Sequence, residues 1–438
     1  MKTKVSFFKI LTALLVLNTN FVKAQIDSTK IESNPYFDLT IEQLLNVDVE
    51  KTGINFYGFF DTYLEKVFNE PGMDGKGKTV KQTSPAEWDS PEFHLYATSK
   101  LSKNVDVLVN IGRREGTFDI MNAYGNMKIN DLFQIRFGKM YRKFGIYNEK
   151  LDQLPSFTGI EPPELFDKDH LFLPRTTLCM ILGEKKINKV TISYALSSEN
   201  GEGGAGKNVR PLGWDLRAKT NSLVIGTSGF CSSIGDGKST STVGLGEGSP
   251  RGGVLPWMSS DRYTVLGGFV EKTFGHLLIQ AEFWNASHDA TRDPASVLTI
   301  VKNTSLNANQ RSDFFGSSAS KADSTLTETD VVKSVKYNVQ TFYVRLGYNV
   351  KTSVGSFIPY VFVDWMTNPE VINSKTWGGD NEAGIADNGI FTKYSLGVVY
   401  KPIDAVAIKL DGSVHSQKFN GKTESYPEIR FDVSYAFK

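Results

Sequence analysis

Charged side chains of opposite sign occupy two neighbouring stretches of the sequence. Fixed charges that face each other across a water-filled passage sort ions and orient polar solutes. A solvated acidic loop above ordinary wall charges would explain the same residues, and the sequence leaves both interpretations open. The basic stretch contains Arg114, Lys128, Arg136 and Arg142. The acidic stretch that follows contains Glu161, Glu164, Asp167 and Asp169 among several prolines.

The histidines indicate neither catalysis nor a metal centre. A metal site needs ligands at short, regular spacings, and nucleophilic catalysis needs a base within hydrogen-bond reach of the nucleophile. No such grouping is visible, so we expect no enzyme activity and no cofactor. The five histidines are scattered, at His94, His170, His276, His288 and His415.

Residues 1–24 have the pattern of an export signal. Lys2 and Lys4 precede an apolar run that ends at Leu17, and Val22-Lys23-Ala24 offers a cleavage site. The run is shorter than the roughly 20 residues that span a bilayer. Removing the four lysines of this segment from the 49 basic residues of the chain leaves 45, against 48 acidic ones. A nucleic-acid partner is therefore not expected.

Residues 25–53 form a polar segment that contains a predicted short helix. Thr40 and Gln43 fit a capping box, and Ile41, Leu44 and Leu45 share one helical face. The dozen residues from Leu39 resemble the segment that precedes the plug in TonB-dependent receptors. The helix could lie at the mouth of a barrel, and an exposed tail is the alternative.

Residues 54–438 alternate between apolar and polar side chains, as strands with one apolar face do. The pattern predicts about sixteen strands, and hence an all-β chain whose strands form an antiparallel meander. The segment 428–438 is the clearest case. One of its faces carries Ile429, Phe431, Val433, Tyr435 and Phe437, and the other carries Arg430, Asp432, Ser434 and Ala436.

The predicted connections are sorted by length. Those after even-numbered strands are short, whereas those after odd-numbered strands are mostly long, including residues 143–175, 231–261, 287–334, 366–390 and 416–427. Short turns at one rim and long loops at the other are typical of transmembrane β-barrels. Aromatic residues near strand ends fit the interfacial girdles of such barrels. They are Tyr63, Trp214, Trp284, Trp365, Tyr400 and Tyr435.

The terminal strand, the strand number and the sorted loops resemble those of the general sixteen-stranded porins of Gram-negative bacteria, although Lys438 follows the terminal aromatic here. The resemblance implies a barrel in the outer membrane, with periplasmic turns and extracellular loops. It also implies passive diffusion of small polar solutes, and it allows a homotrimer or partner membrane proteins. In those porins the third loop folds inward and its acids face basic wall residues. The constriction role would pass to Glu161, Glu164, Asp167 and Asp169, opposite Arg114, Arg136 and Arg142.

Two other functions remain open. A barrel plugged by its N-terminal segment or by its loops would serve as a binding or assembly component of an outer-membrane complex. A hydrophobic-substrate channel, blocked at its mouth by the helix near Leu44 and Leu45, is the second alternative.

Overall fold

The alternating residues form strands in the computed structural model of the chain. All described residues belong to one unit of the chain, Tyr36–Lys438. The predicted export signal and the segment 25–53 lie outside them. The structure describes residues 54–73, 79–114, 117–150, 158–160, 163, 175–199, 211–234, 257–303, 306, 308–370, 389–419 and 421–438.

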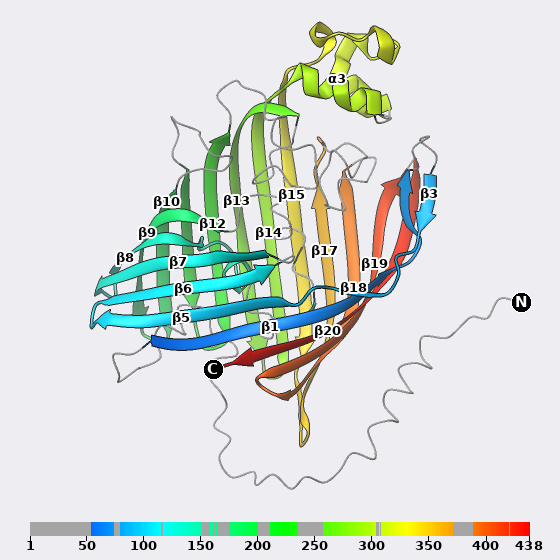
Figure 1. The fold of residues 1–438 in the computed structure, drawn as a ribbon. Helices are drawn as coiled ribbons and strands as arrows, with labels where there is room; N and C mark the ends of the chain where they lie inside the picture. The colour runs from blue at the N-terminus through cyan, green and yellow to red at the C-terminus, as the bar shows by residue number, and fades with distance from the viewer. Residues whose placement is uncertain are drawn as a thin grey trace, which may run out of the picture. The chain divides into compact units, whose positions relative to one another are not determined.

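Sixteen antiparallel strands close into a barrel, which confirms the predicted fold class (Figure 1). Each strand pairs with its successor, and β1 pairs with both β5 and β20, so the sheet has no free edge. The strands are β1 (Ile54–Val67), β5 (Glu92–Ser102), β6 (Val105–Arg114), β7 (Thr117–Asn130), β8 (Phe133–Tyr141), β9 (Arg175–Ile187), β10 (Val190–Glu199), β11 (Leu212–Lys219), β12 (Leu223–Ile234), β13 (Met258–Phe274), β14 (Leu277–Arg292), β15 (Ser334–Tyr348), β17 (Gly355–Thr367), β18 (Ile390–Ile403), β19 (Val406–Phe419) and β20 (Lys422–Phe437).

Short elements decorate the barrel. β4 pairs with β1, β16 pairs with β17 beyond the end of β15, and β2 and β3 form a separate hairpin. Within the described residues, no helix is long and apolar enough to cross a membrane. The elements are β2 (Glu70–Met73), β3 (Thr79–Gln82), β4 (Glu87–Trp88), β16 (Val350–Thr352), η2 (Asn148–Lys150), α3 (Pro294–Asn303), α4 (Ala308–Phe315), η5 (Gly316–Ser318), η6 (Asp323–Thr325) and η7 (Glu328–Asp330).

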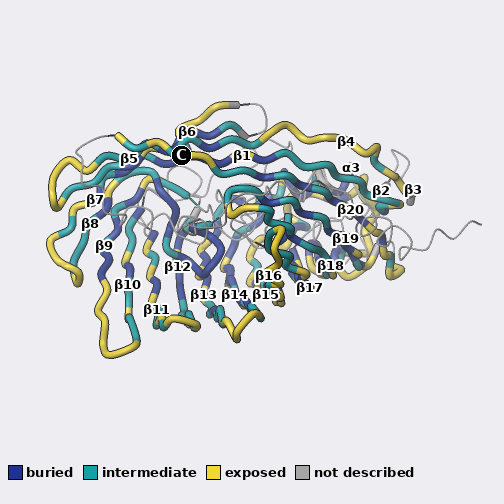
Figure 2. Tube along the Cα trace, turned by 90° about the horizontal axis from the view of Figure 1, so that it is seen from below, coloured by how far each residue is buried: buried dark blue, intermediate teal, exposed yellow. Residues whose placement is uncertain are grey.

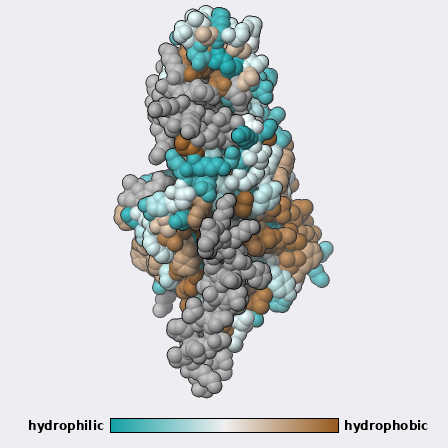
Figure 3. Space-filling view, turned by 90° about the vertical axis from the view of Figure 1, so that its right-hand side faces the viewer, coloured by the Kyte–Doolittle hydropathy of each residue, from teal (hydrophilic) through white to brown (hydrophobic). Residues whose placement is uncertain are grey.

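The apolar face of each strand points outward and the polar face points into the barrel. On β20, Ile429 is 42% exposed, whereas Arg430 is 7% exposed and Asp432 is 1% exposed. Buried and more exposed positions alternate along the wall in the same way (Figure 2). Apolar side chains gather on the outer wall of the barrel, and hydrophilic ones gather towards the top of the view (Figure 3). This orientation confirms the prediction made from the alternation, and it suits a wall that contacts lipid.

Tight turns join the strands at one rim, as predicted. The turn between β13 and β14 is Gly275-His276, and the one between β9 and β10 begins at Asn188. Both Gly275 and Asn188 have positive φ, a conformation that glycine and asparagine tolerate best. At the other rim one prediction is wrong: residues 416–427 are not a long loop. β19 and β20 extend into that stretch and leave only residues 420–421 between them.

Two further details differ from the sequence-based expectation. The predicted loop 287–334 begins later, because β14 continues to Arg292, and it then contains α3 and α4 (Figure 1). The carboxylate of Asp293 accepts a hydrogen bond from the Ser296 N–H and caps α3. Trp284 is not part of the outer girdle. It is fully buried on the inner face of β14, where its ring centroid lies 4.1 Å from that of Phe144.

Candidate functional site

The loop between β8 and β9 turns into the barrel immediately after β8. Its apolar side chains Phe144, Ile146 and Tyr147 are buried against the inner faces of β12–β15. An apolar Phe-Gly-Ile-Tyr run in a connecting loop is the sequence signal for this burial, since a solvated loop gains nothing from such residues. We call residues 142–150 the inward segment. It belongs to the loop to which the resemblance to porins assigns the constriction.

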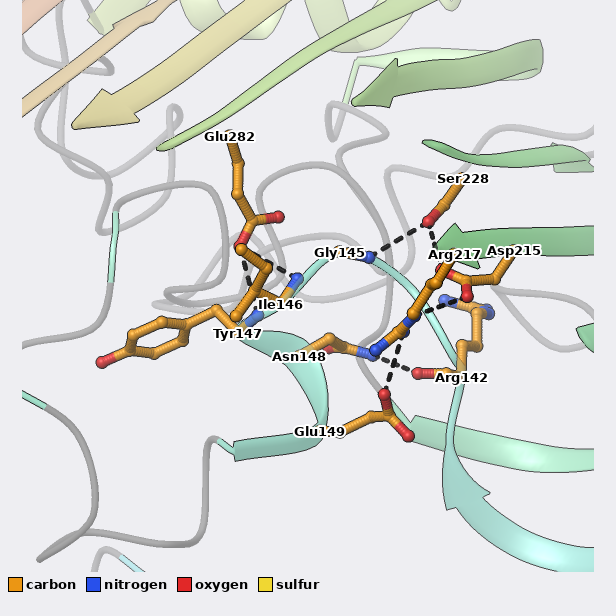
Figure 4. A network of polar contacts seen from close by, with 10 residues as sticks. All are labelled: Arg142, Gly145, Ile146, Tyr147, Asn148, Glu149, Asp215, Arg217, Ser228 and Glu282. Atoms are coloured by element: carbon orange, nitrogen blue, oxygen red, sulfur yellow. Dashed lines mark hydrogen bonds and ion pairs between the residues drawn. The ribbon is translucent and has the colours of Figure 1, made fainter. Parts of the chain in front are cut away.

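Glu282 on β14 holds the tip of the inward segment (Figure 4). Its Oε1 atom accepts hydrogen bonds from the backbone N–H groups of Ile146 and Tyr147, each 3.1 Å long. The Tyr343 hydroxyl donates to the same oxygen at 2.6 Å, and Nε1 of Trp284 donates to Oε2 at 3.2 Å. A buried carboxylate with four donors is well satisfied, so this contact fixes the loop backbone to the wall.

A second anchor joins the inward segment to β11 and β12 (Figure 4). The Gly145 N–H donates to Oγ of Ser228 at 3.1 Å, and that hydroxyl donates to Asp215 at 2.6 Å. Arg217 bridges Asp215 and Glu149, at 2.6 and 3.0 Å. Gly145 has φ +61°, and a Cβ there would clash with Oε2 of Glu282. Only glycine fits this close approach.

The base of the segment is fixed by a buried ion pair. Nε of Arg142 donates to Oε1 of Glu199 on β10 at 2.7 Å, and Nη2 contacts Oε2 of the same carboxylate. The guanidinium also lies 4.1 Å from the ring centroid of Phe230, and the Asn148 side chain donates to the Arg142 carbonyl at 2.8 Å. The charge of Arg142 is therefore paired within the wall.

The other predicted site residues occupy different environments. Arg136 is buried on the inner face of β8, where its Nε donates to Oδ1 of Asn126 at 3.1 Å. Lys128 lies near a short turn, with Nζ 2.8 Å from Oδ1 of Asp131, and this ammonium holds the pKa of the Asp131 carboxyl below its usual value. The side chain of Arg114, at the end of β6, lies outside the described residues. So do Glu161, Glu164, Asp167 and Asp169.

A later part of the same loop reaches further around the barrel. A Cβ built on Gly159 would stand 3.2 Å from Nη2 of Arg345 on β15 and 3.7 Å from the Tyr360 hydroxyl on β17. The described parts of the loop thus contact the strands from β10 to β15 and β17.

The inner wall beyond these strands carries a row of charges on β19, β20 and β1. Arg430 contacts Glu428 at 2.6 Å and Glu65 at 3.1 Å. Lys409 lies 3.5 Å from Asp432. These side chains face the interior because each occupies a polar position of its strand. In the part of the chain that the structure describes, no group of three or more potential ligand side chains could hold a metal ion.

No protein-family model and no curated protein matches the chain. Solved barrels do. An anion-selective porin from Comamonas acidovorans has a TM-score of 0.51 at 12% identity, over 88% of this chain and 100% of that one. The outer membrane channel DcaP of Acinetobacter baumannii has a TM-score of 0.51 at 10% identity, over 88% and 97%. Identities this low establish the fold alone. The chain therefore has the fold of the bacterial outer-membrane porins, a closed antiparallel barrel of sixteen strands.

Proposed function

We propose that the chain is a porin of the bacterial outer membrane, through which small hydrophilic solutes diffuse passively. The apolar outer wall suits contact with lipid. The closed sheet suits a bilayer as well, because it leaves no unpaired backbone group facing lipid. The polar inner wall suits water and polar solutes. A plugged barrel would have both features, so the proposal depends on whether the loop inside the barrel leaves part of the interior open.

The inward segment is the observation that carries the proposal. Among the described residues it packs against one arc of the wall, where Glu282, Ser228 and Glu199 fix it. We infer that a loop fixed in this way narrows the interior and leaves a passage along the other arc. The charge row Glu65, Lys409, Arg430 and Asp432 lines that second arc and would meet a passing solute.

The charged constriction predicted from the sequence remains part of the proposal in modified form. Arg136 is an inner-wall cation, whereas the charge of Arg142 is neutralised by Glu199. The acids Glu161, Glu164, Asp167 and Asp169 stay as predicted partners on the loop, and Arg114 stays a predicted wall cation. We expect their field to bias the selectivity of the channel.

A plugged barrel in a membrane-protein complex and a hydrophobic-substrate channel are the alternatives. A hydrophobic substrate suits the inner wall poorly, because buried charges line it. We expect no enzyme activity, and a homotrimer is the assembly that we would test first.

The decisive experiment is single-channel recording of the purified full-length protein in a planar bilayer. We expect a steady open current in KCl that rises in proportion to the voltage and does not decay with time. A folded barrel that inserts but stays silent would contradict the proposal and favour the plugged barrel. Heat-modifiable migration on a denaturing gel establishes folding before each recording.

A further inference from the structure

Acidic side chains outnumber basic ones on the arc of the inner wall that faces the proposed passage. This arc runs over β18, β19, β20, β1 and the start of β5, which pair in that order. Among the described residues of the arc, six acids and three bases point inward between the two rims. The acids are Asp411, Glu428, Asp432, Asp61, Glu65 and Glu92, and the bases are Lys393, Lys409 and Arg430.

Each base of this arc lies near an acid, so its charge is offset. Arg430 lies 2.6 Å from Glu428, and Lys409 lies 3.5 Å from Asp432. Lys393 interacts electrostatically with Glu428 as well. Opposite charges at such distances largely cancel at a point further away. Matching each base with one acid leaves three acids in excess.

Two of the acids can share one proton, which lowers this excess. The carboxyl of Asp61 is hydrogen-bonded to that of Asp432, and two carboxylates in contact do not readily ionise together. His415 lies 2.8 Å from Glu428 and is left out of the count, because the charge of a histidine depends on pH. Counting the Asp61 and Asp432 pair as one charge still leaves two excess negative charges.

The bases are more deeply covered than some of the acids. Lys393 is 3% exposed and Lys409 is 1% exposed. The side chain of Arg430 is 8% exposed, whereas that of its partner Glu65 is 34% exposed. Glu92 is half-buried. An ion that moves along this arc therefore comes closer to Glu65 and Glu92 than to the bases behind them.

The rest of the described inner wall does not compensate for this excess. Arg345 on β15 is offset by Glu282 and Asp364, because all three act electrostatically on one tyrosine hydroxyl. Arg136 on β8 adds one positive charge, fewer than the two excess negative charges. Other inward arginines are paired with carboxylates. The pairs are Arg142 with Glu199, Arg217 with Asp215 and Glu149, and Arg292 with Glu370.

We propose that the channel prefers small cations to anions, an inference that rests on the proposed function and names the class of solute that the passage favours. Fixed negative charge along a narrow aqueous path raises the local concentration of cations and lowers that of anions. This effect needs no binding pocket, because a field acts across the Debye length of about 10 Å in dilute salt. The basic wall predicted from the sequence would favour anions instead.

The test measures the reversal potential of the full-length protein in a planar bilayer across a KCl gradient. Mildly alkaline buffer disfavours a charge on His415. We expect K⁺ to be more permeant than Cl⁻, and the preference to grow when both solutions are diluted, because dilution weakens the screening of fixed charges. Glu65→Gln combined with Glu92→Gln should lower the permeability ratio of K⁺ to Cl⁻ about twofold or more, since each lost charge acts on the two ions with opposite sign.

Asp289→Asn is the matched control. It removes an acid whose side chain is 58% exposed on the outer face of β14, and it should leave the ratio unchanged. Glu92→Gln alone serves if the double variant does not fold, with a smaller fall in the ratio. An open wild-type channel that shows no preference or prefers Cl⁻ would overturn this inference and leave the porin proposal intact, whereas a silent barrel would overturn both. An unchanged ratio in the folded Glu65 and Glu92 variant would also contradict the inference.

Discussion

The backbone N–H of Tyr147 donates a 3.1 Å hydrogen bond to Oε1 of Glu282, across 135 residues of sequence. This contact joins the tip of the inward segment to β14 in the barrel wall. Because the same carboxylate also accepts from Ile146, Tyr343 and Trp284, its removal affects the loop and the wall together.

Glu282→Ala should release the inward segment. Four donors would lose their acceptor, at about 1–3 kcal/mol for each one that stays buried. We expect a larger and noisier single-channel conductance, together with a lower midpoint of unfolding in urea. Glu184→Ala, at an exposed position of β9, is the control and should change neither quantity. A folded Glu282→Ala protein with wild-type conductance and noise would contradict the role of the segment as a constriction.

Arg142→Met should destabilise the barrel more than it alters selectivity. It strips Glu199 of its partner, and an uncompensated buried charge costs about 3–5 kcal/mol. The double variant Arg142→Met with Glu199→Leu should recover most of that loss, as apolar replacements of buried pairs commonly do. Urea unfolding of the single and double variants measures both effects. Additive losses in the double variant would mean that the two side chains do not act as a pair.

The sequence predicted the barrel well because the facing of a strand is a local property. Ile429 and Arg430 point to opposite sides whatever their neighbours do, and repetition of this pattern fixes the strand number. The placement of Trp284 failed because an aromatic near an apparent strand end belongs to the girdle only if it faces outward. Trp284 shares the inner face of β14 with Glu282, whereas Phe283 between them is 48% exposed.

The site was harder to predict than the fold. Arg142 and Glu199 are 57 residues apart, and nothing near either residue identifies the other. Glu282 is one polar residue among many on inner faces, and only the loop that meets it makes it special. The loop itself did carry a signal, the buried run from Phe144 to Tyr147, because apolar residues between two strands must find a surface to cover.

Leu396→Arg tests whether the outer wall contacts lipid. Leu396 is 57% exposed on the outer face of β18, between the ends of the strand. An arginine at the midplane of a bilayer costs about 2–4 kcal/mol, falling to about 0–1 kcal/mol near the interface. Ile390→Arg, at the first residue of β18, is the matched control. Unfolding in lipid vesicles should separate the two variants, and equal small losses would contradict a bilayer around this wall.

Asp330 should make the loop between β14 and β15 sensitive to acid. The Lys321 ammonium and the Ser318 hydroxyl donate to its carboxylate at 2.6 and 2.7 Å, and the Thr327 N–H donates at 2.9 Å. These donors, with Lys321 the largest contributor, hold the pKa of the Asp330 carboxyl well below its usual 3.8. The ionised Asp330 carboxylate thus stabilises the folded loop fully above about pH 3.8. This stabilisation is lost as the pH falls through the lower pKa of the folded state.

Amide hydrogen exchange of residues 316–330 between pH 2 and 7, corrected for intrinsic rates, measures this effect. We expect constant protection above about pH 5 and a fall in protection below about pH 4. Asp330→Asn should lower the protection above pH 5 and abolish its pH dependence. A wild-type loop whose protection changes between pH 5 and 7 instead would show that another group controls it.

Arg136 and Lys128 provide the sharpest test of the predicted basic wall, because the pattern placed both on the inner face and the structure separates them. Arg136 is buried inside the barrel, whereas Lys128 pairs with Asp131 at an exposed turn. Arg136→Ala should therefore shift the reversal potential in a KCl gradient towards cation preference, since it removes a fixed positive charge from a water-filled passage. Lys128→Ala makes a comparable change in charge outside the narrow region and should leave the reversal potential unchanged. Equal shifts in the two variants would mean that net charge, and not the position of Arg136 on the inner wall, sets the selectivity.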